Sequence, residues 1–400
     1  MSLTQAQALV LKNVRPLPGV WVPLVQALGE PTTKDETARA DLPRWDLAAK
    51  DGYALAAGKT QGADSYFPAV FKVVGRLFAG APPGKRLGEE EAARIMTGAL
   101  LPSGADAIVP LEQVQESRGY IKVFGVVPTG SNVKRKGEDV QQGDLIVRKG
   151  VSLNPRELEV LAALGKKGVR VFRRPKVAVL CTGDELMMPG ERVRQGRVVA
   201  SNSFLLQSLV LGLGGKIIFS RVVPDREALI RSAFLKGKGA DLIISSGGAS
   251  RGDKDLTGSS LEKLGAKIMY QEVAISPGRH QIFALLGRVP VCALPGGPTA
   301  LFVAYEQLVR PALLKMRGFS NPLRLPVKGV LTEPVSGRRG EQNFKDARAF
   351  WQGERLFVRP VKSWHLAGPG NEGEIPALIV LEEDRELVQA GEVVTVQLLT

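Results

Sequence analysis

The spacing of hydrophobic and polar residues changes several times along the chain. Residues 1 to about 40 carry apolar side chains at helical spacing, which predicts helix. Residues 45–135 carry short apolar runs interrupted by glycine and proline, which predicts a mostly β segment. Residues 150–165 predict a capped helix, because Asn154 can cap its first amides and Pro155 suits its first turn.

From residue 176 the pattern alternates between strand and helix. Apolar runs that predict buried strands lie at 176–181, 216–219 and 241–244. Helical patterns lie between them, at 204–213 and 226–237. Apolar strands separated by helices favour a parallel sheet that is covered on both faces. After residue 318 the chain returns to short β-like runs, which include 377–381 and 392–398.

Length and composition limit the class of protein. A chain of 400 residues suggests two to four domains, and its hydrophobic content of 44% is typical of globular proteins. No apolar run reaches about 18 residues, so we expect no membrane helix. The first residues lack the basic flank and apolar core of a signal peptide, and we expect a cytoplasmic protein. Its two cysteines, in apolar runs, predict buried thiols rather than a disulfide framework.

The net charge of +14 raises the question of nucleic-acid binding. The basic residues are scattered, however, and only 6% of residues are aromatic, so we expect no nucleic-acid partner. Local basic clusters suit a small anionic ligand equally well. With only two histidines, any bound metal would be held by oxygen ligands, which favours Mg²⁺.

The segment SSGGASRGDKD directly follows the predicted strand at 241–244. In open parallel sheets, ligands bind beyond the carboxyl ends of the strands. Gly247 and Gly248 allow backbone amides to approach a ligand, and the serines can donate to phosphate oxygens. Asp253 and Asp255 suit such a site if a cation joins them to the phosphate. The alternative is a tight turn with solvated charges.

The segment CTGDEL forms a second turn at a predicted strand end. Thr182 and Gly183 can form a bend that faces an anion, and Asp184 and Glu185 add carboxylates. Alone, this segment could equally be a surface turn or a helix cap. Two acidic turns at one sheet edge favour a bound cation or substrate, because like charges held close are unfavourable.

Six separated segments, in this order, resemble the molybdopterin molybdenumtransferase family, which includes bacterial MoeA and the C-terminal domain of gephyrin. The similarity extends over nearly the whole chain. Taken singly, the segments outside the two turns are more typical of structure than of catalysis. The matching segments are 51–54, 95–107, 135–139, 182–186, 245–255 and 294–298.

The resemblance implies a multidomain α/β fold. It has a central three-layer α/β domain with a parallel-type sheet, a mostly-β domain, a helical, elongated linking domain and a C-terminal β-barrel. The expected boundaries are 1–44 with 136–174 for the linking domain, 45–135 for the mostly-β domain, 175–318 for the α/β molybdopterin-binding domain and 319–400 for the barrel.

The resemblance also implies an activity, the insertion of molybdate into adenylylated molybdopterin with Mg²⁺-dependent release of AMP. It implies a homodimer whose active site combines the second domain of one subunit with the third of the other. A transient contact with the molybdopterin adenylyltransferase is expected. The expected catalytic residues are Asp51, Thr97, Asp139, Glu185, Asp225 and Asp255, of which Glu185, Asp225 and Asp255 are expected to hold the metal.

Substrate-binding residues are implied in the same way. Gly247, Gly248 and Ser250 would hold phosphate, and Arg279 would offer positive charge to an oxyanion. The full expected binding set is Thr182, Gly183, Ser246, Gly247, Gly248, Ser250, Pro277, Gly278, Arg279, Pro295, Gly296 and Pro298.

The chain departs from the family pattern in its cationic segment. The usual K-P-G-K-P is Ser-Pro-Gly-Arg-His at 276–280, and the usual L-P-G-N-P has Gly297 in place of asparagine. The acidic residues are kept. Two alternatives therefore stay open, a diverged paralogue that handles tungstate or only carries the pterin, and a non-enzymatic scaffold.

Overall fold

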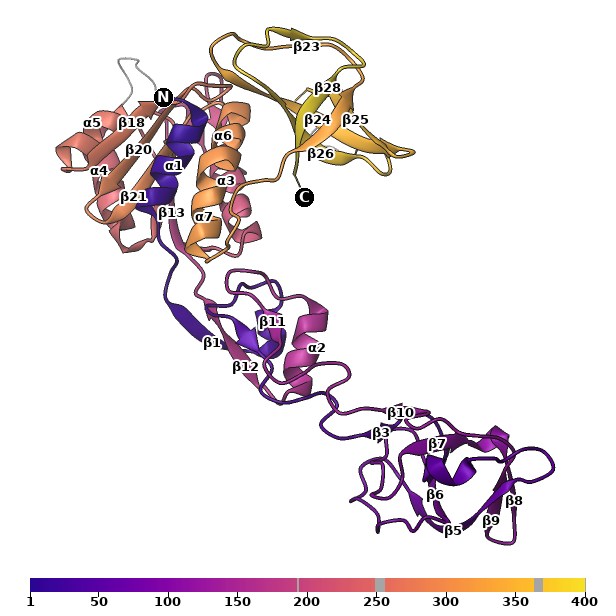
Figure 1. Ribbon diagram of the computed structural model, residues 1–400. Helices are drawn as coiled ribbons and strands as arrows, with labels where there is room; N and C mark the ends of the chain where they lie inside the picture. Colours follow the sequence, from indigo (N-terminus) through magenta and orange to yellow (C-terminus); the bar gives the residue numbers. More distant parts are fainter. Residues whose placement is uncertain (193, 249–255, 363–369, 400) are drawn as a thin grey trace.

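The computed structural model describes residues 1–192, 194–248, 256–362 and 370–399 (Figure 1). The molecule is elongated. An α/β unit (residues 1–18 and 175–318) and a barrel unit (322–399) lie side by side at one end. A small linking unit (19–46 and 135–174) connects the α/β unit to a distal β unit (47–134) at the other end (Figure 1).

A mixed six-stranded sheet forms the centre of the α/β unit. Its parallel strands are, in spatial order, β16 (Lys216–Val223), β13 (Lys176–Thr182), β17 (Leu242–Ser246) and β21 (Val289–Leu294). Two antiparallel strands complete it, β20 (His280–Leu286) and β18 (Lys267–Glu272). Short strands β14 (Leu186–Met187) and β15 (Val198–Val199) pair in the loop after β13.

Helices cover both faces of this sheet, so the predicted three-layer α/β architecture is confirmed. One face packs against α1 (Leu3–Asn13), α3 (Ser201–Gly212), α6 (Pro298–Ala304), a π-helical turn (Tyr305–Val309) and α7 (Arg310–Met316). The other packs against α4 (Glu227–Lys236) and α5 (Leu256–Lys263). A short 3₁₀ turn, η4 (Gly237–Gly239), follows α4. Both cysteines are buried in this sheet as free thiols, and burial raises the pKa of Cys181 to about 12.

The first helix is shorter than predicted and belongs by its contacts to the α/β unit. Leu3, Ala6 and Val10 are buried in the core of that unit, whereas residues 1–44 were all expected in the linking domain. Helix ends at Asn13 rather than near residue 40. Prolines follow closely, and proline cannot continue a helix.

The linking unit holds one helix and two small sheets. Strand β1 (Gly19–Pro23) pairs with β12 (Gly168–Phe172), and β2 (Glu36–Thr37) pairs with β11 (Leu145–Val147). The 3₁₀ turn η1 (Leu24–Ala27) follows β1. Helix α2 (Pro155–Ala163) begins as predicted, because Asn154 Oδ1 accepts from the Glu157 amide at 3.0 Å.

A buried ion-pair network fixes the linking unit to the α/β unit. Glu30 is 5% exposed and accepts from Arg174 at 2.9 Å and from Arg317 at 2.5 Å. Arg317 lies at the end of α7 and also donates to the Leu213 carbonyl at 2.7 Å. Removing one partner of a buried ion pair typically costs about 3–5 kcal/mol, so this junction is held firmly.

The distal β unit is a six-stranded sheet with the order β7-β4-β6-β5-β9-β8. Its strands are β4 (Gly52–Leu55), β5 (Ala69–Leu77), β6 (Glu91–Ile95), β7 (Ala107–Pro110), β8 (Val114–Ser117) and β9 (Tyr120–Val123). Two 3₁₀ turns, η2 (Ala57–Thr60) and η3 (Leu111–Gln113), connect them. Strands β3 (Leu47–Ala48) and β10 (Val133–Lys134) pair where the chain enters and leaves the unit.

The C-terminal unit is the predicted β-barrel. Strand β24 (Gln342–Gln352) pairs with both β25 (Arg355–Pro360) and β26 (Ile375–Leu381). Strand β22 (Val327–Leu331) pairs with β25 and with β28 (Val393–Leu398), and β28 also pairs with β26. These five strands therefore close into a barrel. Strands β23 (Val335–Ser336) and β27 (Leu387–Val388) form a separate pair, and β19 (Ile275–Ser276) links the α/β unit to β24. Within the described residues, no helix has the length and apolar character needed to span a bilayer.

Candidate active site at the carboxyl edge of the sheet

The four parallel strands of the α/β unit end at one edge of the sheet. The loops after neighbouring strands are joined there, since the Gly183 amide donates to Val223 O at 3.2 Å and the Gly247 amide to Leu294 O at 3.3 Å. Strand β13 starts shortly after β12 of the linking unit, so its carboxyl end points away from that unit (Figure 1). This edge holds thirteen of the residues predicted for binding or catalysis: Thr182, Gly183, Glu185, Asp225, Ser246, Gly247, Gly248, Pro277, Gly278, Arg279, Pro295, Gly296 and Pro298.

The two glycines after β17 are required by their neighbours. Gly247 has φ +93°, and a Cβ there would lie 2.3 Å from the Thr182 carbonyl oxygen. Gly248 has φ +62°, and a Cβ there would lie 2.7 Å from Thr257 Oγ1. Only glycine tolerates both the positive φ and the close approach. The glycines therefore allow the segment after β17 to lie against the end of β13 and the start of α5, whether or not a ligand also lies against them.

Among the described residues, three buried polar atoms near this edge lack a hydrogen-bond partner, namely Thr182 Oγ1, Asn202 Oδ1 and Ser245 Oγ. Burying such a group without a partner typically costs about 1–3 kcal/mol, and native structures contain few of them. Thr182 and Asn202 lie at the strand ends, where a bound molecule would supply partners, whereas Ser245 lies in β17 on the face that packs against α4 and α5. The sequence patterns predict Thr182 as a binding residue but give no signal for Asn202. Asn202 lies in the first turn of α3, far along the chain from the glycine segment.

The amino end of α3 adds positive character to the edge. The helix begins at Ser201 without a side-chain cap and with no acidic residue in its first turn. The first amides of a helix lack internal partners and carry the positive end of its dipole, which favours anions. Asn202 lies among these amides, and its Nδ2 donates to Ser246 Oγ at 3.0 Å and to Gly296 O at 2.7 Å.

Carboxylates lie at the ends of β13 and β16. The Asp184 amide donates to Asp225 Oδ2 at 3.2 Å, and the Asp225 amide donates to Asp184 Oδ1 at 3.1 Å. The Glu185 carboxylate folds back over Gly183, because a Cβ on that glycine would lie 2.5 Å from Glu185 Oε1. Arg197 donates to the backbone carbonyl of Asp184 and holds the turn.

The metal-binding prediction rests on three of these acids. Glu185 and Asp225 follow neighbouring strands of the sheet, while Asp255, like Ser250, lies outside the described residues. Among the described residues, no group of three or more His, Cys, Asp or Glu side chains could hold a metal ion by itself. Glu185 and Asp225 would therefore need further oxygen ligands from a substrate or from water.

The segment that contains Arg279 carries less free charge than the sequence suggested. Arg279 Nη1 lies 3.3 Å from Glu341 Oε1, and its Nε and Nη2 lie 3.4 and 3.3 Å from Glu272 Oε2. His280 Nδ1 lies 3.4 Å from the other oxygen of Glu272. Two carboxylates thus offset the guanidinium, whose side chain is 56% exposed.

The loops around Gly278 and Gly296 complete the edge. A Cβ at Gly278, which has φ +114°, would lie 3.2 Å from the Ala300 carbonyl in α6. Ser246 Oγ donates to the Pro295 carbonyl at 3.3 Å, so the loops after β17 and β21 are in direct contact. Helix α6 starts at Pro298 with Gly297 before it and no side-chain cap.

The other predicted acids form a separate group in and beside the distal β unit. Asp51 Oδ1 accepts from both the backbone amide and the hydroxyl of Thr97, each at 2.7 Å. These two hydrogen bonds, the backbone one first, lower the pKa of Asp51. Asp139 forms an exposed ion pair with Lys134 at 2.6 Å. Within one chain, the linking unit separates the distal β unit, and with it Asp51 and Thr97, from the α/β unit (Figure 1).

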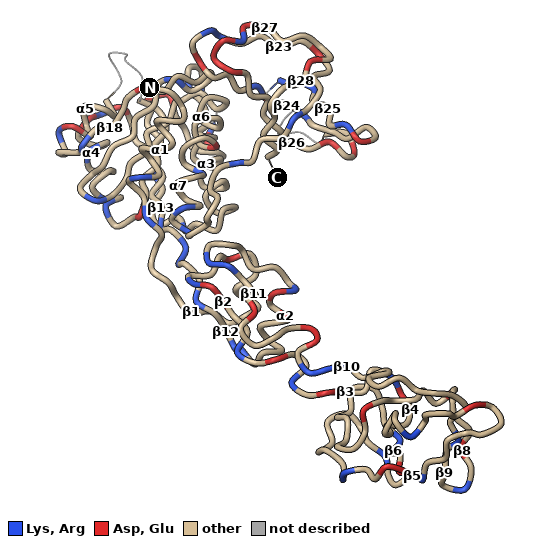
Figure 2. The backbone as a smooth tube through the Cα atoms, viewed as in Figure 1, with Lys and Arg blue, Asp and Glu red and all other residues tan. Residues whose placement is uncertain are grey.

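Charge is distributed along the whole molecule. Figure 2 shows lysine and arginine in all of the units, with acidic residues interspersed among them. The basic character of the chain therefore does not mark a single binding face among the described residues.

Comparison with known proteins places these features in a family. Residues 1–165 match the family model described as "MoeA N-terminal region (domain I and II)". Residues 178–315 match the model described as "Probable molybdopterin binding domain". The second match contains the sheet edge, and the first contains Asp51, Thr97 and Asp139.

Curated relatives and solved structures cover almost the whole chain. The molybdopterin molybdenumtransferase of Haemophilus influenzae is 32% identical over 99% of this chain and 98% of its own length. Molybdopterin molybdenumtransferase 2 of Mycobacterium tuberculosis is 32% identical over 98% of this chain and 97% of its own. A crystal structure of the molybdopterin biosynthesis MoeA protein from Pyrococcus horikoshii has a TM-score of 0.87 at 31% identity, covering 100% of this chain and 99% of that one.

Proposed function

The chain belongs to the molybdopterin molybdenumtransferase family and is a transferase of molybdenum cofactor biosynthesis, and we propose that it inserts molybdate into adenylylated molybdopterin with release of AMP. The observation that carries the proposal is the carboxyl edge of the α/β sheet. There, unpartnered polar atoms, an uncapped helix start and two carboxylates lie around one set of glycine loops.

Each part of this edge has a role in the proposal. The first amides of α3 and the Thr182 hydroxyl donate to the pyrophosphate of the substrate. The loops at Gly247 and Gly296 hold the substrate against the sheet edge. Gly247, Gly248 and Gly296 carry no side chains, so the substrate can lie close to the backbone there.

Glu185 and Asp225 are proposed to hold Mg²⁺. They suit this ion, because Mg²⁺ commonly takes one or two carboxylates and completes its ligands with substrate phosphate and water oxygens. The chemistry that Mg²⁺ supplies when bound is neutralisation of charge on the pyrophosphate. The two carboxylates in turn keep the ion at the strand ends, beside the helix amides that receive the phosphate.

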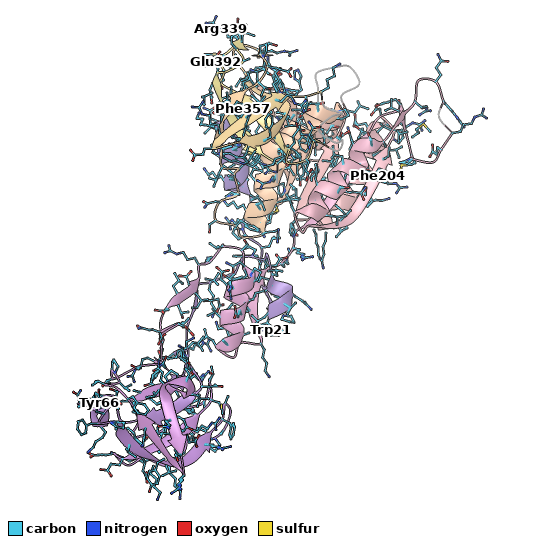
Figure 3. The ribbon with its side chains drawn as sticks, turned by 90° about the vertical axis from the view of Figure 1, so that its right-hand side faces the viewer. Trp21, Tyr66, Phe204, Arg339, Phe357 and Glu392 are labelled. Carbon is cyan, nitrogen blue, oxygen red and sulfur yellow. The ribbon has the colours of Figure 1, made fainter. Side chains whose placement is uncertain are left out.

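A complete site is proposed to need two copies of the chain. Asp51 and Thr97 lie in the distal β unit, and Asp139 lies in the linking unit beside its junction with that unit, so all three lie away from the sheet edge of their own chain (Figure 1). In a symmetric dimer, the distal β unit of one subunit can face the sheet edge of its partner. Exposed apolar residues on the linking unit and on α3 supply surface for such a dimer, since Trp21 is 57% and Phe204 48% exposed (Figure 3).

Mixing two impaired variants tests the shared site. Asp51→Asn and Glu185→Gln should each lose most of their activity as homodimers. If each site combines the two chains, mixed dimers contain one intact site and restore up to about a quarter of wild-type activity after equal mixing. If both groups act within one chain, or independently of each other, mixing restores nothing.

The central experiment measures AMP release from adenylylated molybdopterin with Mg²⁺, comparing molybdate, tungstate and no oxyanion. Release that depends on molybdate supports the proposed reaction. Absence of release under every condition, despite tight pterin binding, contradicts it and leaves a carrier of the pterin.

The pairing of Arg279 with Glu272 and Glu341 favours a second candidate, a transferase with altered oxyanion preference. A guanidinium that two carboxylates already offset attracts an oxyanion less strongly than a free lysine would. In this case, release would be stimulated by tungstate but not by molybdate.

The adenylylated substrate must come from an adenylyl-transfer reaction. We propose a transient contact with the molybdopterin adenylyltransferase, in the cytoplasm, because a short-lived contact allows direct transfer of the pterin. Faster product formation from the two enzymes together than from the free intermediate at equal concentration would support this contact.

A further inference from the structure

One side chain connects the loops of the sheet edge, and neither the family comparison nor the sequence analysis assigns it a role. Asn202 lies in the first turn of α3, on the chain between β13 and β16. Its Nδ2 donates to Ser246 Oγ at the end of β17 and to Gly296 O in the loop after β21. It therefore joins a helix to a strand end and a loop that are far apart in the sequence.

The orientation of this amide follows from its partners. The Gly296 carbonyl can only accept a hydrogen bond, so the group that faces it at 2.7 Å must be the NH₂. Ser246 Oγ accepts from the same NH₂ and donates onward to the Pro295 carbonyl at 3.3 Å. Asn202, Ser246 and the loop at 295–297 thus form one hydrogen-bonded chain.

The other end of the amide is incomplete. Asn202 Oδ1 is buried and has no hydrogen-bond partner in the part of the chain that the structure describes. A carboxamide oxygen only accepts, so the group that would satisfy it is an N–H or O–H donor and not a phosphate oxygen. The ring N–H and amino groups of a pterin and the amino and hydroxyl groups of a nucleotide are donors of this kind.

We propose that Asn202 is a positioning residue of the substrate site, which holds the Ser246–Gly248 and Pro295–Gly297 loops at a fixed separation and accepts a hydrogen bond from a donor group of the substrate. The substrate named here rests on the proposed function. The connection of the two loops does not, because it follows from hydrogen bonds within the protein. Loss of Asn202 would leave the Gly296 carbonyl without its donor and detach both segments from α3, so that the Ser246–Pro295 and Gly247–Leu294 hydrogen bonds would have to join them without the helix.

The first test needs no substrate. Hydrogen–deuterium exchange is compared between the wild type, Asn202→Ala and Asn202→Asp, the last keeping the shape of the side chain but losing the NH₂. Both variants should exchange about fivefold faster or more in peptides that contain 242–248 and 294–297, with β26 unchanged. Unchanged exchange in either loop peptide would overturn the proposal.

The second test measures binding of AMP and of molybdopterin separately, by calorimetry. Asn202→Ala should weaken at least one of them about tenfold with little change in Tm, and the half that weakens more carries the donor. Gln207→Ala is the matched control, because its amide lies on the same helix but donates to Ser203. A fall in Tm with both affinities unchanged would make Asn202 merely structural. If the wild type itself binds neither compound, the proposed function fails, while the exchange experiment still decides the connection of the loops.

Discussion

The two groups of acidic site residues differ in how far the fold satisfies them. In the distal β unit, Asp51 accepts two hydrogen bonds from Thr97 at 2.7 Å, so the free protein already fixes the carboxylate. At the sheet edge, Asp225 accepts from the Asp184 amide and Glu185 folds over Gly183, but the buried Thr182 and Asn202 oxygens nearby have no partner among the described residues. A site whose polar groups already have partners in the free protein is expected to orient the substrate. A site with unpartnered polar groups is expected to bind it. The distal pair is thus suited to act on a substrate that the sheet edge holds.

The largest effect is expected from a substitution at the sheet edge. Glu185→Gln removes a charge from the proposed metal site, and we expect AMP release to fall about 100-fold or more. The exposed position of Glu185 predicts an unchanged Tm. Glu191→Gln, an exposed acid in the same loop, is the control and should retain wild-type activity. A Glu185→Gln enzyme with normal turnover would remove Glu185 from the site.

Much of this contrast could not be predicted from the sequence. The apolar runs and the cap at Asn154 predicted the α/β sheet and helix α2, because these signals are local. The role of Asn202 depends on loops that meet only after the sheet has formed, and no local pattern marks it. The same holds for Arg279, since Glu341 reaches it from the barrel.

The next largest effect is expected from a substitution of Asp51 in the distal β unit. Asp51→Asn keeps an oxygen for the two Thr97 donors but removes the charge, so we expect the fold to persist while AMP release falls about tenfold to a hundredfold. Asp64→Asn is a close control, because Asp64 Oδ1 also accepts two hydrogen bonds, from Tyr66 and Phe67 in the same unit. Equal activities of the two variants would show that Asp51 only stabilises a turn.

A smaller effect is expected from freeing Arg279, at the sheet edge, from one of its carboxylate partners. Glu341→Gln removes one of the two carboxylates that offset Arg279, so molybdate should bind about threefold to tenfold more tightly. The measurement is calorimetric titration with molybdate at constant ionic strength. Glu354→Gln, in the exposed turn between β24 and β25, should leave the affinity unchanged. Weaker binding in Glu341→Gln would mean that Glu341 positions Arg279 rather than competing for it.

The smallest effect concerns the protonation of Asp51. Thr97→Ala removes the hydroxyl donor but keeps the backbone amide, which is the larger cause of the lowered pKa. The pKa of Asp51 should therefore rise only part of the way toward its ordinary value, as NMR titration of the carboxyl carbon would show. Because the pKa of Asp51 is lowered in the folded protein, the ionised wild-type carboxylate stabilises the fold at pH values above its unfolded pKa. This stabilisation is lost as the pH falls through the folded pKa. Thr97→Ala should lose part of that stabilisation at neutral pH while making stability less sensitive to acid. An unchanged pKa would mean that the amide alone fixes the charge, and Thr97 would then act on the substrate directly rather than through Asp51.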